Sequence, residues 1–181
     1  MLDDLNRQEI KDLTDKYPFL LPYGKNGVLS EDYDYTDIFP IEIPVGWDML
    51  FLQMCEDLRT ALIEDDLIDE FRFHQVKEKF GEMVCYCNIN THKIDAVLDK
   101  YCFMSKYVCS QCGKPATYKS VGWTVPFCGK CSRLLRGNYK FMPISFQDYL
   151  YCTSNRYDID ECTVKISFNE EWNRYVNSIT E

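Results

Sequence analysis

The sequence lacks the features that mark membrane proteins and secreted proteins. No stretch approaches the roughly 20 unbroken apolar residues that a membrane-spanning helix needs. The first five residues carry two aspartates and no basic side chain, so they do not show the basic, then apolar, pattern of a signal peptide. We therefore expect a cytoplasmic protein that has no membrane partner.

Sequence motifs of common enzyme classes are also missing. The chain has no phosphate-binding loop, dinucleotide-binding fingerprint or nucleophile elbow. It has only two histidines, His74 and His92, and no pattern places either beside a thiol and a third orienting group. Carboxylates are abundant, as in any acidic chain. We favour a protein that is not an enzyme, and a small hydrolase or transferase stays open as a third alternative.

The composition is that of a soluble domain with a large aromatic content. The 181 residues are 46% apolar and 27% charged, and they include thirteen tyrosines, eleven phenylalanines and three tryptophans. Such a chain can build a core without disulfides. Because no export signal accompanies the ten cysteines, they are predicted to be free thiols or metal ligands.

Four of the cysteines have the spacing of a metal site. They form two Cys-x-x-Cys knuckles separated by fifteen residues, with the ligands Cys109, Cys112, Cys128 and Cys131. This spacing is typical of a tetrahedral zinc site of four thiolates. Four thiolates leave no open coordination position, so the predicted zinc is structural and not catalytic. Iron at the same sulfurs is the alternative.

The other thiols give a weaker signal. Cys85 and Cys87 would point to one face of a strand, and with Cys102 or His92 they could form a second metal site. Core thiols are the interpretation that we favour. The remaining three are interpreted as buried or incidental, namely Cys55, Cys152 and Cys162.

Charge is divided unevenly along the chain. Residues 1–70 hold eighteen acidic and five basic side chains, whereas residues 106–140 hold seven basic and no acidic ones. A basic segment with interleaved rings can bind nucleic acid through phosphates and stacked bases. The candidate residues are Lys114, Lys119, Trp123, Lys130, Arg133 and Arg136. Alternatively, these cations balance the thiolate cluster and the acidic part of the chain.

Apolar periodicity predicts an α+β fold. Helical spacing predicts helices over 3–16, 47–63 and 92–104, and residues 17–45 are predicted to be irregular. Alternation predicts a hairpin with strands at 71–76 and 83–87 around a turn at 77–81. We expect a small antiparallel sheet packed by helices, into which a four-cysteine zinc ribbon of short hairpins is inserted.

We expect three segments within one compact unit. Residues 1–105 form the α+β core with its acidic N-terminal region, and residues 106–140 form the zinc ribbon. Residues 141–181 are predicted to pack back on the core, with a strand at 163–168 and a helix at 170–179.

Several short motifs, taken together, resemble those of a family of small proteins encoded by bacteriophages and prophages. The resemblance covers roughly residues 17–131. It rests on Tyr17-Pro18-Phe19-Leu20-Leu21-Pro22, Gly46-Trp47, Gln75-Val76-Lys77-Glu78-Lys79-Phe80-Gly81, the Cys-x-x-Cys-Gly-Lys-Pro run at 109–115, Gly122-Trp123 and the knuckle at 128–131. It implies an accessory protein in the cytoplasm of a bacterial host cell, with a ribbon-like metal site, and it supplies no catalytic residues.

The favoured function is therefore contact with another macromolecule. We expect a non-catalytic zinc-ribbon protein that binds a host protein, such as a defence protein, and inhibits or redirects it. The alternative is a nucleic-acid-binding regulator that uses the basic segment. The sequence does not fix the oligomeric state, and an oligomer stays open.

Overall fold

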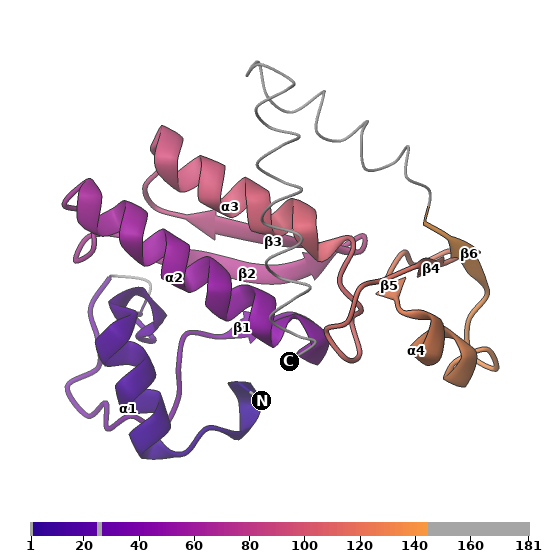
Figure 1. Ribbon diagram of the computed structural model, residues 1–181. Coiled ribbons are helices and arrows are strands. Elements are labelled where there is room, and N and C mark those ends of the chain that lie inside the picture. Colours follow the sequence, from indigo (N-terminus) through magenta and orange to yellow (C-terminus); the bar gives the residue numbers. More distant parts are fainter. Residues whose placement is uncertain (1, 25–26, 145–181) are drawn as a thin grey trace.

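Two small three-stranded sheets, each with its own helices, organise the chain (Figure 1). The computed structural model describes residues 2–24 and 27–144. The first sheet has the strand order β1-β2-β3 and the second has the order β5-β4-β6. The predicted α+β class is confirmed. The first sheet differs from the prediction in one respect, because β1 runs parallel to β2 and the sheet is mixed.

The N-terminal helix begins later than predicted. Helix α1 spans Arg7–Lys16, after a short 3₁₀ turn at Leu2–Asp4. The side chain of Asn6 accepts hydrogen bonds from the backbone N–H groups of Gln8 and Glu9, and the Glu9 carboxylate accepts one from the Asn6 N–H. This reciprocal cap satisfies donors that have no partner within the helix, so the helix starts directly after Asn6.

The predicted irregular segment contains one short strand. Strand β1 spans Ile41–Glu42, between 3₁₀ turns at Pro18–Leu20 and Val45–Trp47. It pairs with β2, which spans Phe73–Lys79. A strand of two residues is too short to show an alternating pattern, which explains why the sequence gives no signal for it.

The predicted hairpin forms, but its turn is tighter than expected. Strand β3 spans Glu82–Cys87 and pairs antiparallel with β2. Only Phe80 and Gly81 lie between the strands, and both have positive φ, as a two-residue hairpin turn requires. A bulge between Phe73 and Gln75 also shifts the alternation, so Val76 is buried and Gln75 is not.

Helices α2 (Asp48–Glu64) and α3 (His92–Ser105) lie side by side over one face of the first sheet (Figure 1). Both agree closely with the predicted helices. The core between these helices and the sheet is rich in rings. Phe71 lies edge-on to both Phe19 and Phe73, with ring centroids 5.8 and 5.2 Å apart.

Residues 106–143, which we call the four-cysteine module, follow α3. The module contains β4 (Tyr118–Ser120), β5 (Pro126–Phe127), α4 (Gly129–Leu134) and β6 (Phe141–Pro143). Strands β4 and β5 form the kind of short hairpin that was predicted. The second knuckle does not lie in a hairpin but at the start of helix α4. Strand β6 pairs with β4, so the module's sheet extends past the predicted end of the ribbon at residue 140.

The predicted strand at 163–168 and helix at 170–179 lie outside the described residues, as do Cys152 and Cys162. Within the described part of the chain, no helix is both long and apolar enough to cross a membrane.

Candidate metal centre

The first knuckle is a tight turn directly after α3. The backbone N–H of Cys109 donates to the carbonyl of Lys114 (2.8 Å), and the N–H of Gly113 donates back to the carbonyl of Cys109 (3.0 Å). Gly113 has a φ of +73°, which glycine adopts without strain. These bonds turn the chain so that Cys109 and Cys112 face the same point.

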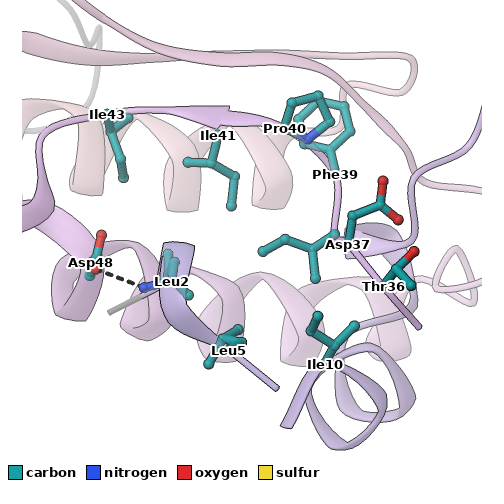
Figure 2. A pocket seen from close by; sticks show the side chains of 11 residues that line it. Leu2, Leu5, Ile10, Thr36, Asp37, Phe39, Pro40, Ile41, Ile43 and Asp48 are labelled. Carbon is teal, nitrogen blue, oxygen red and sulfur yellow. Dashed lines mark hydrogen bonds between the residues drawn. The ribbon is translucent and has the colours of Figure 1, made fainter. Parts of the chain in front are cut away.

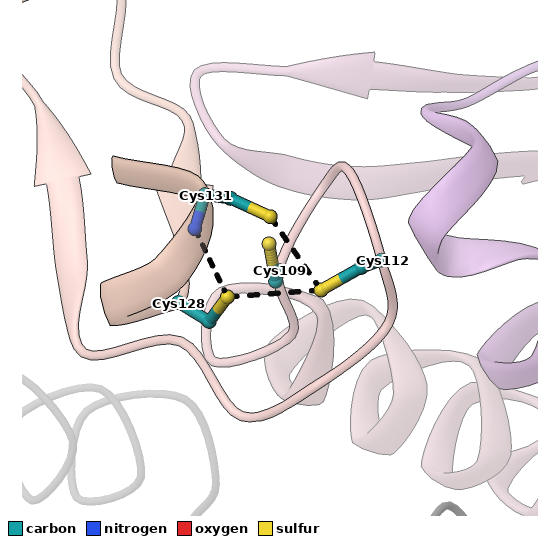
Figure 3. Close-up of side chains that lie close together, drawn as sticks. All are labelled: Cys109, Cys112, Cys128 and Cys131. Atoms are coloured by element: carbon teal, nitrogen blue, oxygen red, sulfur yellow. Dashed lines mark hydrogen bonds between the residues drawn. The ribbon is translucent and has the colours of Figure 1, made fainter. Parts of the chain in front are cut away.

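The geometry of the second knuckle is determined by the start of helix α4. Cys128 is the N-cap residue of α4, and its Sγ accepts a hydrogen bond from the backbone N–H of Cys131 (3.4 Å). The Cys128 carbonyl accepts from the N–H of Ser132 (2.9 Å). Cys131 lies in the first turn, so both sulfurs are held on the side of the helix that faces the first knuckle (Figure 3).

The four sulfurs converge as a tetrahedral site requires (Figure 3). All four Sγ atoms lie within 4.8 Å of one another. The Sγ of Cys112 lies 3.7 Å from that of Cys128 and 3.7 Å from that of Cys131. Four thiolates bound at about 2.3 Å to one tetrahedral ion would be about 3.8 Å apart. All four cysteines are free thiols, so the cluster can hold a metal ion.

Protons compete with a bound cation for the sulfurs of the cluster. Burial raises the pKa of the Cys109 thiol. For Cys128, burial is outweighed by hydrogen bonds from backbone N–H groups and from neighbouring thiols, and the pKa is lowered to about 7. Burial and the adjacent sulfurs raise the pKa of Cys131. Sulfurs this close cannot all ionise without a cation, so metal binding must release protons.

The metal site is joined to the core through α2 and the turn before it. The indole Nε1–H of Trp47 donates to the carbonyl of Val108 (2.9 Å), and the N–H of Gly46 donates to the carbonyl of Ser110 (3.0 Å). A Cβ atom on Gly46 would lie 2.2 Å from the Cys109 carbonyl oxygen. The Gly-Trp pair therefore lets the first knuckle sit directly on the core. Sequence reasoning missed this role of Gly46 and Trp47.

A second contact joins the module to the core at the tips of two hairpins. The ring of Phe80, in the β2–β3 turn, lies 6.1 Å from that of Trp123, in the β4–β5 connection. Both side chains stay largely exposed, at 67% and 61%. Gly81 approaches so closely that a Cβ there would lie 2.7 Å from the carbonyl oxygen of Thr124. We call Phe80 and Trp123 the aromatic seam.

Among the described residues, Cys85, Cys87 and Cys102 do not form a second metal site. The Sγ atoms of Cys85 and Cys102 lie 4.0 Å apart, but the Cys87 thiol donates elsewhere, to the Ile89 carbonyl and the Asn90 side chain. Hydrogen bonding with Cys102 and burial raise the pKa of Cys85. Within residues 2–24 and 27–144, the four-cysteine cluster is the only group of three or more ligand side chains close enough to hold an ion.

The six candidate nucleic-acid residues lie on different elements of the module. Lys130 and Arg133 are three residues apart on α4, and Arg136 follows the helix. Lys114 lies after the first knuckle, whereas Lys119 is on β4 and Trp123 belongs to the aromatic seam. Lys114, Lys130, Arg133 and Arg136 are exposed, and Lys119 is half-buried.

A cavity of about 240 Å³ lies beside the first sheet, between the N-terminal residues and the chain that leads into β1 (Figure 2). Ile41 and Ile43 face Leu2 and Leu5 across it. Asp48, at one end, accepts a hydrogen bond from the N–H of Leu2 (3.1 Å). The described residues of the lining include carboxylates and a threonine, but no histidine, cysteine, serine or lysine.

Comparisons of this chain with protein-family models, with curated protein sequences and with solved structures found no match. The metal centre, the aromatic seam and the charge distribution are therefore the features from which a function can be inferred. The four-cysteine cluster defines the candidate site, and the seam lies on the surface that the module and the core share.

Proposed function

We propose that this is a non-catalytic binding protein in which zinc holds the four-cysteine module against the core, so that their shared surface can bind another macromolecule. The observation that carries the proposal is the aromatic seam, in which two large rings are exposed at fixed positions. The partner that we propose is a protein of a bacterial host cell, as the resemblance to phage-encoded proteins implies, which would be inhibited or redirected by the contact.

Zinc is the ion that best fits the cluster. Four thiolates at tetrahedral spacing are typical of structural zinc, and such a closed site has no position for a water or a substrate. The metal would therefore act on folding and not on a reaction. In this proposal it fixes the two knuckles, and through them the β4–β5 hairpin that carries Trp123. Iron at the same sulfurs is the alternative that metal analysis distinguishes.

The aromatic seam has the properties of a protein contact. Trp and Phe are enriched at the centres of interfaces, where burying one such side chain contributes roughly 1.5–3 kcal/mol. Phe80 lies on a two-residue hairpin turn, and the backbone carbonyl of Trp123 accepts a hydrogen bond from the Ser120 hydroxyl, so little conformational entropy is lost when a partner covers the rings. The Lys79 ammonium lies 5.7 Å from the centroid of the Phe80 ring, at the edge of the seam. These features support an apolar contact with a basic margin.

Capture from host lysate, at native salt and with the metal intact, tests the proposal. We expect the full chain to recover a specific protein, and we expect Trp123→Ala and Phe80→Ala to lose it. Leu134→Ala is the matched control, because Leu134 is 74% exposed in the same module but lies outside the seam. The proposal fails if no specific protein is recovered, or if the seam variants capture it as well as the control does.

Nucleic-acid binding is a second candidate because residues 106–140 contain no acidic side chain. It predicts a gel shift that weakens steeply with salt, since cations on phosphates release counterions. Neutralising Lys119, Arg133 and Arg136 together should abolish the shift. Neutralising three cations of the core, Arg7, Lys11 and Lys93, is the control with the same charge change. No shift at low salt removes this candidate.

A further inference from the structure

Two thiols outside the metal centre meet between strand β3 and helix α3. The Cys102 thiol, on α3, donates a hydrogen bond to the sulfur of Cys85, on β3, and the two Sγ atoms lie 4.0 Å apart. Cys102 is buried and Cys85 is half-buried. A disulfide has a sulfur–sulfur distance of about 2.05 Å, so each sulfur must move by about 1 Å to reach the other. We call these two residues the thiol pair.

Hydrogen bonds hold the backbones of β3 and α3 together beside the thiol pair. The N–H of Met83 donates to the Ser105 hydroxyl (2.8 Å). That hydroxyl donates in turn to the carbonyl of Cys102 (2.5 Å). One serine therefore joins β3 to the turn of α3 that carries Cys102. Because the two elements are already fixed at this point, a disulfide would not have to draw them together.

A shared metal ion does not account for the contact between the two sulfurs. Zinc prefers four ligands, and the thiol of Cys87 donates to Ile89 and Asn90 instead of joining the pair. Within residues 2–24 and 27–144, no third cysteine, histidine or carboxylate completes a ligand set around them. Two adjacent thiols without a third ligand can still lose two electrons together and form a disulfide.

A cavity of about 230 Å³ adjoins both cysteines. The described residues that line it include Cys85, Cys102 and Leu98, and it has room for a molecule as small as hydrogen peroxide. We expect Cys85 to react first because it is the less buried thiol. Hydrogen bonding with Cys102 and burial raise the pKa of Cys85, so its thiolate is scarce and the first step is slow. The second step is fast because the Cys102 sulfur is already in contact.

We propose that Cys85 and Cys102 are a peroxide-sensitive site that closes to a disulfide and cross-links α3 to β3. The Cys85 sulfur gives up its proton and attacks one oxygen of hydrogen peroxide, so that an S–O bond forms, the O–O bond breaks and hydroxide leaves with that proton as water. The Cys102 sulfur then attacks the Cys85 sulfur, the S–S bond forms, and the S–O bond breaks. The second hydroxide leaves with the Cys102 proton as water. Two thiols are oxidised, and one peroxide is reduced to two waters.

The cross-link would stabilise the part of the core on which the first knuckle rests. Helix α3 ends at Ser105, shortly before the knuckle begins at Cys109. A disulfide between Cys85 and Cys102 closes a short loop, and this constraint should lower the unfolding equilibrium constant on the order of a hundredfold. The inference goes beyond the proposed binding function and does not depend on it, since neither the aromatic seam nor the four-cysteine cluster takes part.

Peroxide treatment of the full-length, metal-loaded chain, followed by alkylation, digestion and mass spectrometry, tests the site. We expect a new pair of peptides joined through Cys85 and Cys102, which reduction by dithiothreitol separates again. In the oxidised chain, the slowest amides of α3 and β3 should exchange on the order of a hundredfold more slowly. Absence of this link, or a link from Cys85 to another cysteine such as Cys152 or Cys162, would overturn the proposal. Faster exchange in α3 and β3 would overturn it as well.

Cysteine variants test whether the two thiols act together. In Cys102→Ser, a sulfenic acid at Cys85 has no sulfur to meet, so it should accumulate and be trapped by dimedone, whereas the unchanged chain should be labelled at least tenfold less. Cys85→Ser should form no link. Cys87→Ser is the matched control, because Cys87 lines the same cavity but its thiol points elsewhere, and it should form the link at the unchanged rate. Equal dimedone labelling of Cys85 in the unchanged chain and in Cys102→Ser, or loss of the link in Cys87→Ser, would refute the pair.

Discussion

The α+β core and the four-cysteine module are stabilised in different ways. The core buries its large apolar side chains almost completely, including Trp47, Phe51 and Leu50 at 0% exposure. The module has a far smaller buried cluster, whose members are Cys109, Phe127 and Cys128. Two of these three belong to the four-cysteine cluster that can hold a metal ion. Hydrophobic burial accounts for the core, whereas in our proposal the module depends on an ion to bring its elements together.

The boundary between the two buried clusters falls between adjacent residues near the start of the module. Val108 is buried within the core cluster, and the next residue, Cys109, belongs to the cluster of the module. The hydrogen bond from Gly46 to Ser110 crosses this boundary, and that from Trp47 to Val108 reaches its core side. The comparison teaches that a region with little core of its own can still have a fixed contact with its neighbour, because the first knuckle of the four-cysteine cluster rests directly on the core.

Loss of a metal ligand should produce the largest difference in stability between the two regions. Cys112 is exposed, so Cys112→Ser removes a ligand without opening a cavity in the core. Structural zinc sites contribute on the order of 10 kcal/mol to the folding of small modules, so we expect the module to unfold. The core should keep its cooperative unfolding. Amide exchange, followed residue by residue, is the measurement.

Cys87→Ser is the control for this substitution, because it removes a half-buried thiol outside the metal centre. It should leave exchange in the module unchanged. Retention of the ion and of slow exchange in Cys112→Ser would contradict the dependence of the module on its metal.

The junction can be disturbed without touching a ligand. In Gly46→Ala the new Cβ would lie 2.2 Å from the Cys109 carbonyl oxygen, so the knuckle and the core must move apart. We expect a loss of roughly 1–3 kcal/mol in the free energy of unfolding, as for other overpacked sites. Gly137→Ala, where nothing lies within 4 Å, is the matched control. Equal denaturant midpoints for the two variants would refute the close docking.

Acid should act on the two regions at different pH values. Thiolate ligands must be protonated for the metal to leave, and the pKa of the Cys128 thiol without metal is about 7. In the core, the hydrogen bond from Lys16, followed by that from Tyr17, lowers the pKa of Glu56. That stabilisation is complete above the unfolded-state pKa of about 4.3 and is lost as the pH falls through the lower folded-state value.

We therefore expect metal release at a higher pH than the acid weakening of the core. Glu56→Gln should remove a pH-dependent contribution of less than about 1 kcal/mol, because the ion pair with Lys16 is largely exposed. Metal release and core unfolding, each followed across a pH titration, are the two measurements. Coincident transitions, unaltered by Glu56→Gln, would show that the regions do not respond separately.

The smallest effect is expected within the first knuckle. The Ser110 hydroxyl is buried and has no hydrogen-bond partner within residues 2–24 and 27–144. Ser110→Ala removes an unsatisfied polar group and should change the free energy of unfolding by less than about 1 kcal/mol, in the stabilising direction. Thermal unfolding of the metal-loaded protein measures it. A clear loss of stability would mean that the hydroxyl makes a contact on which the knuckle depends.

Local patterns in the sequence were sufficient to predict some features of the structure. Residues 47–63 show helical spacing of apolar side chains, and α2 spans Asp48–Glu64. The convergence of the four cysteines was predicted from spacing alone, because two Cys-x-x-Cys turns are short enough to encode their own geometry. Sequence reasoning also selected Trp123, which is one ring of the aromatic seam.

Other features depend on contacts between distant residues, which no local pattern encodes. Strand β1 exists because Ile41 meets Val76, and two residues show no period of their own. The bulge before Val76 reverses the alternation that predicted Gln75 on the same face as Phe73. The contact between Phe80 and Trp123 forms only when the module docks on the core. Tertiary packing therefore decides the features that local periodicity cannot show.

The metal content of the purified chain tests the central claim most directly. Elemental analysis, combined with X-ray absorption at the metal edge, should find one zinc per chain with four sulfur ligands at about 2.3 Å. Such a result would establish that the four cysteines of the module hold a single structural ion. A chain purified under reducing conditions without metal, or with nitrogen or oxygen among the ligands, would contradict this account.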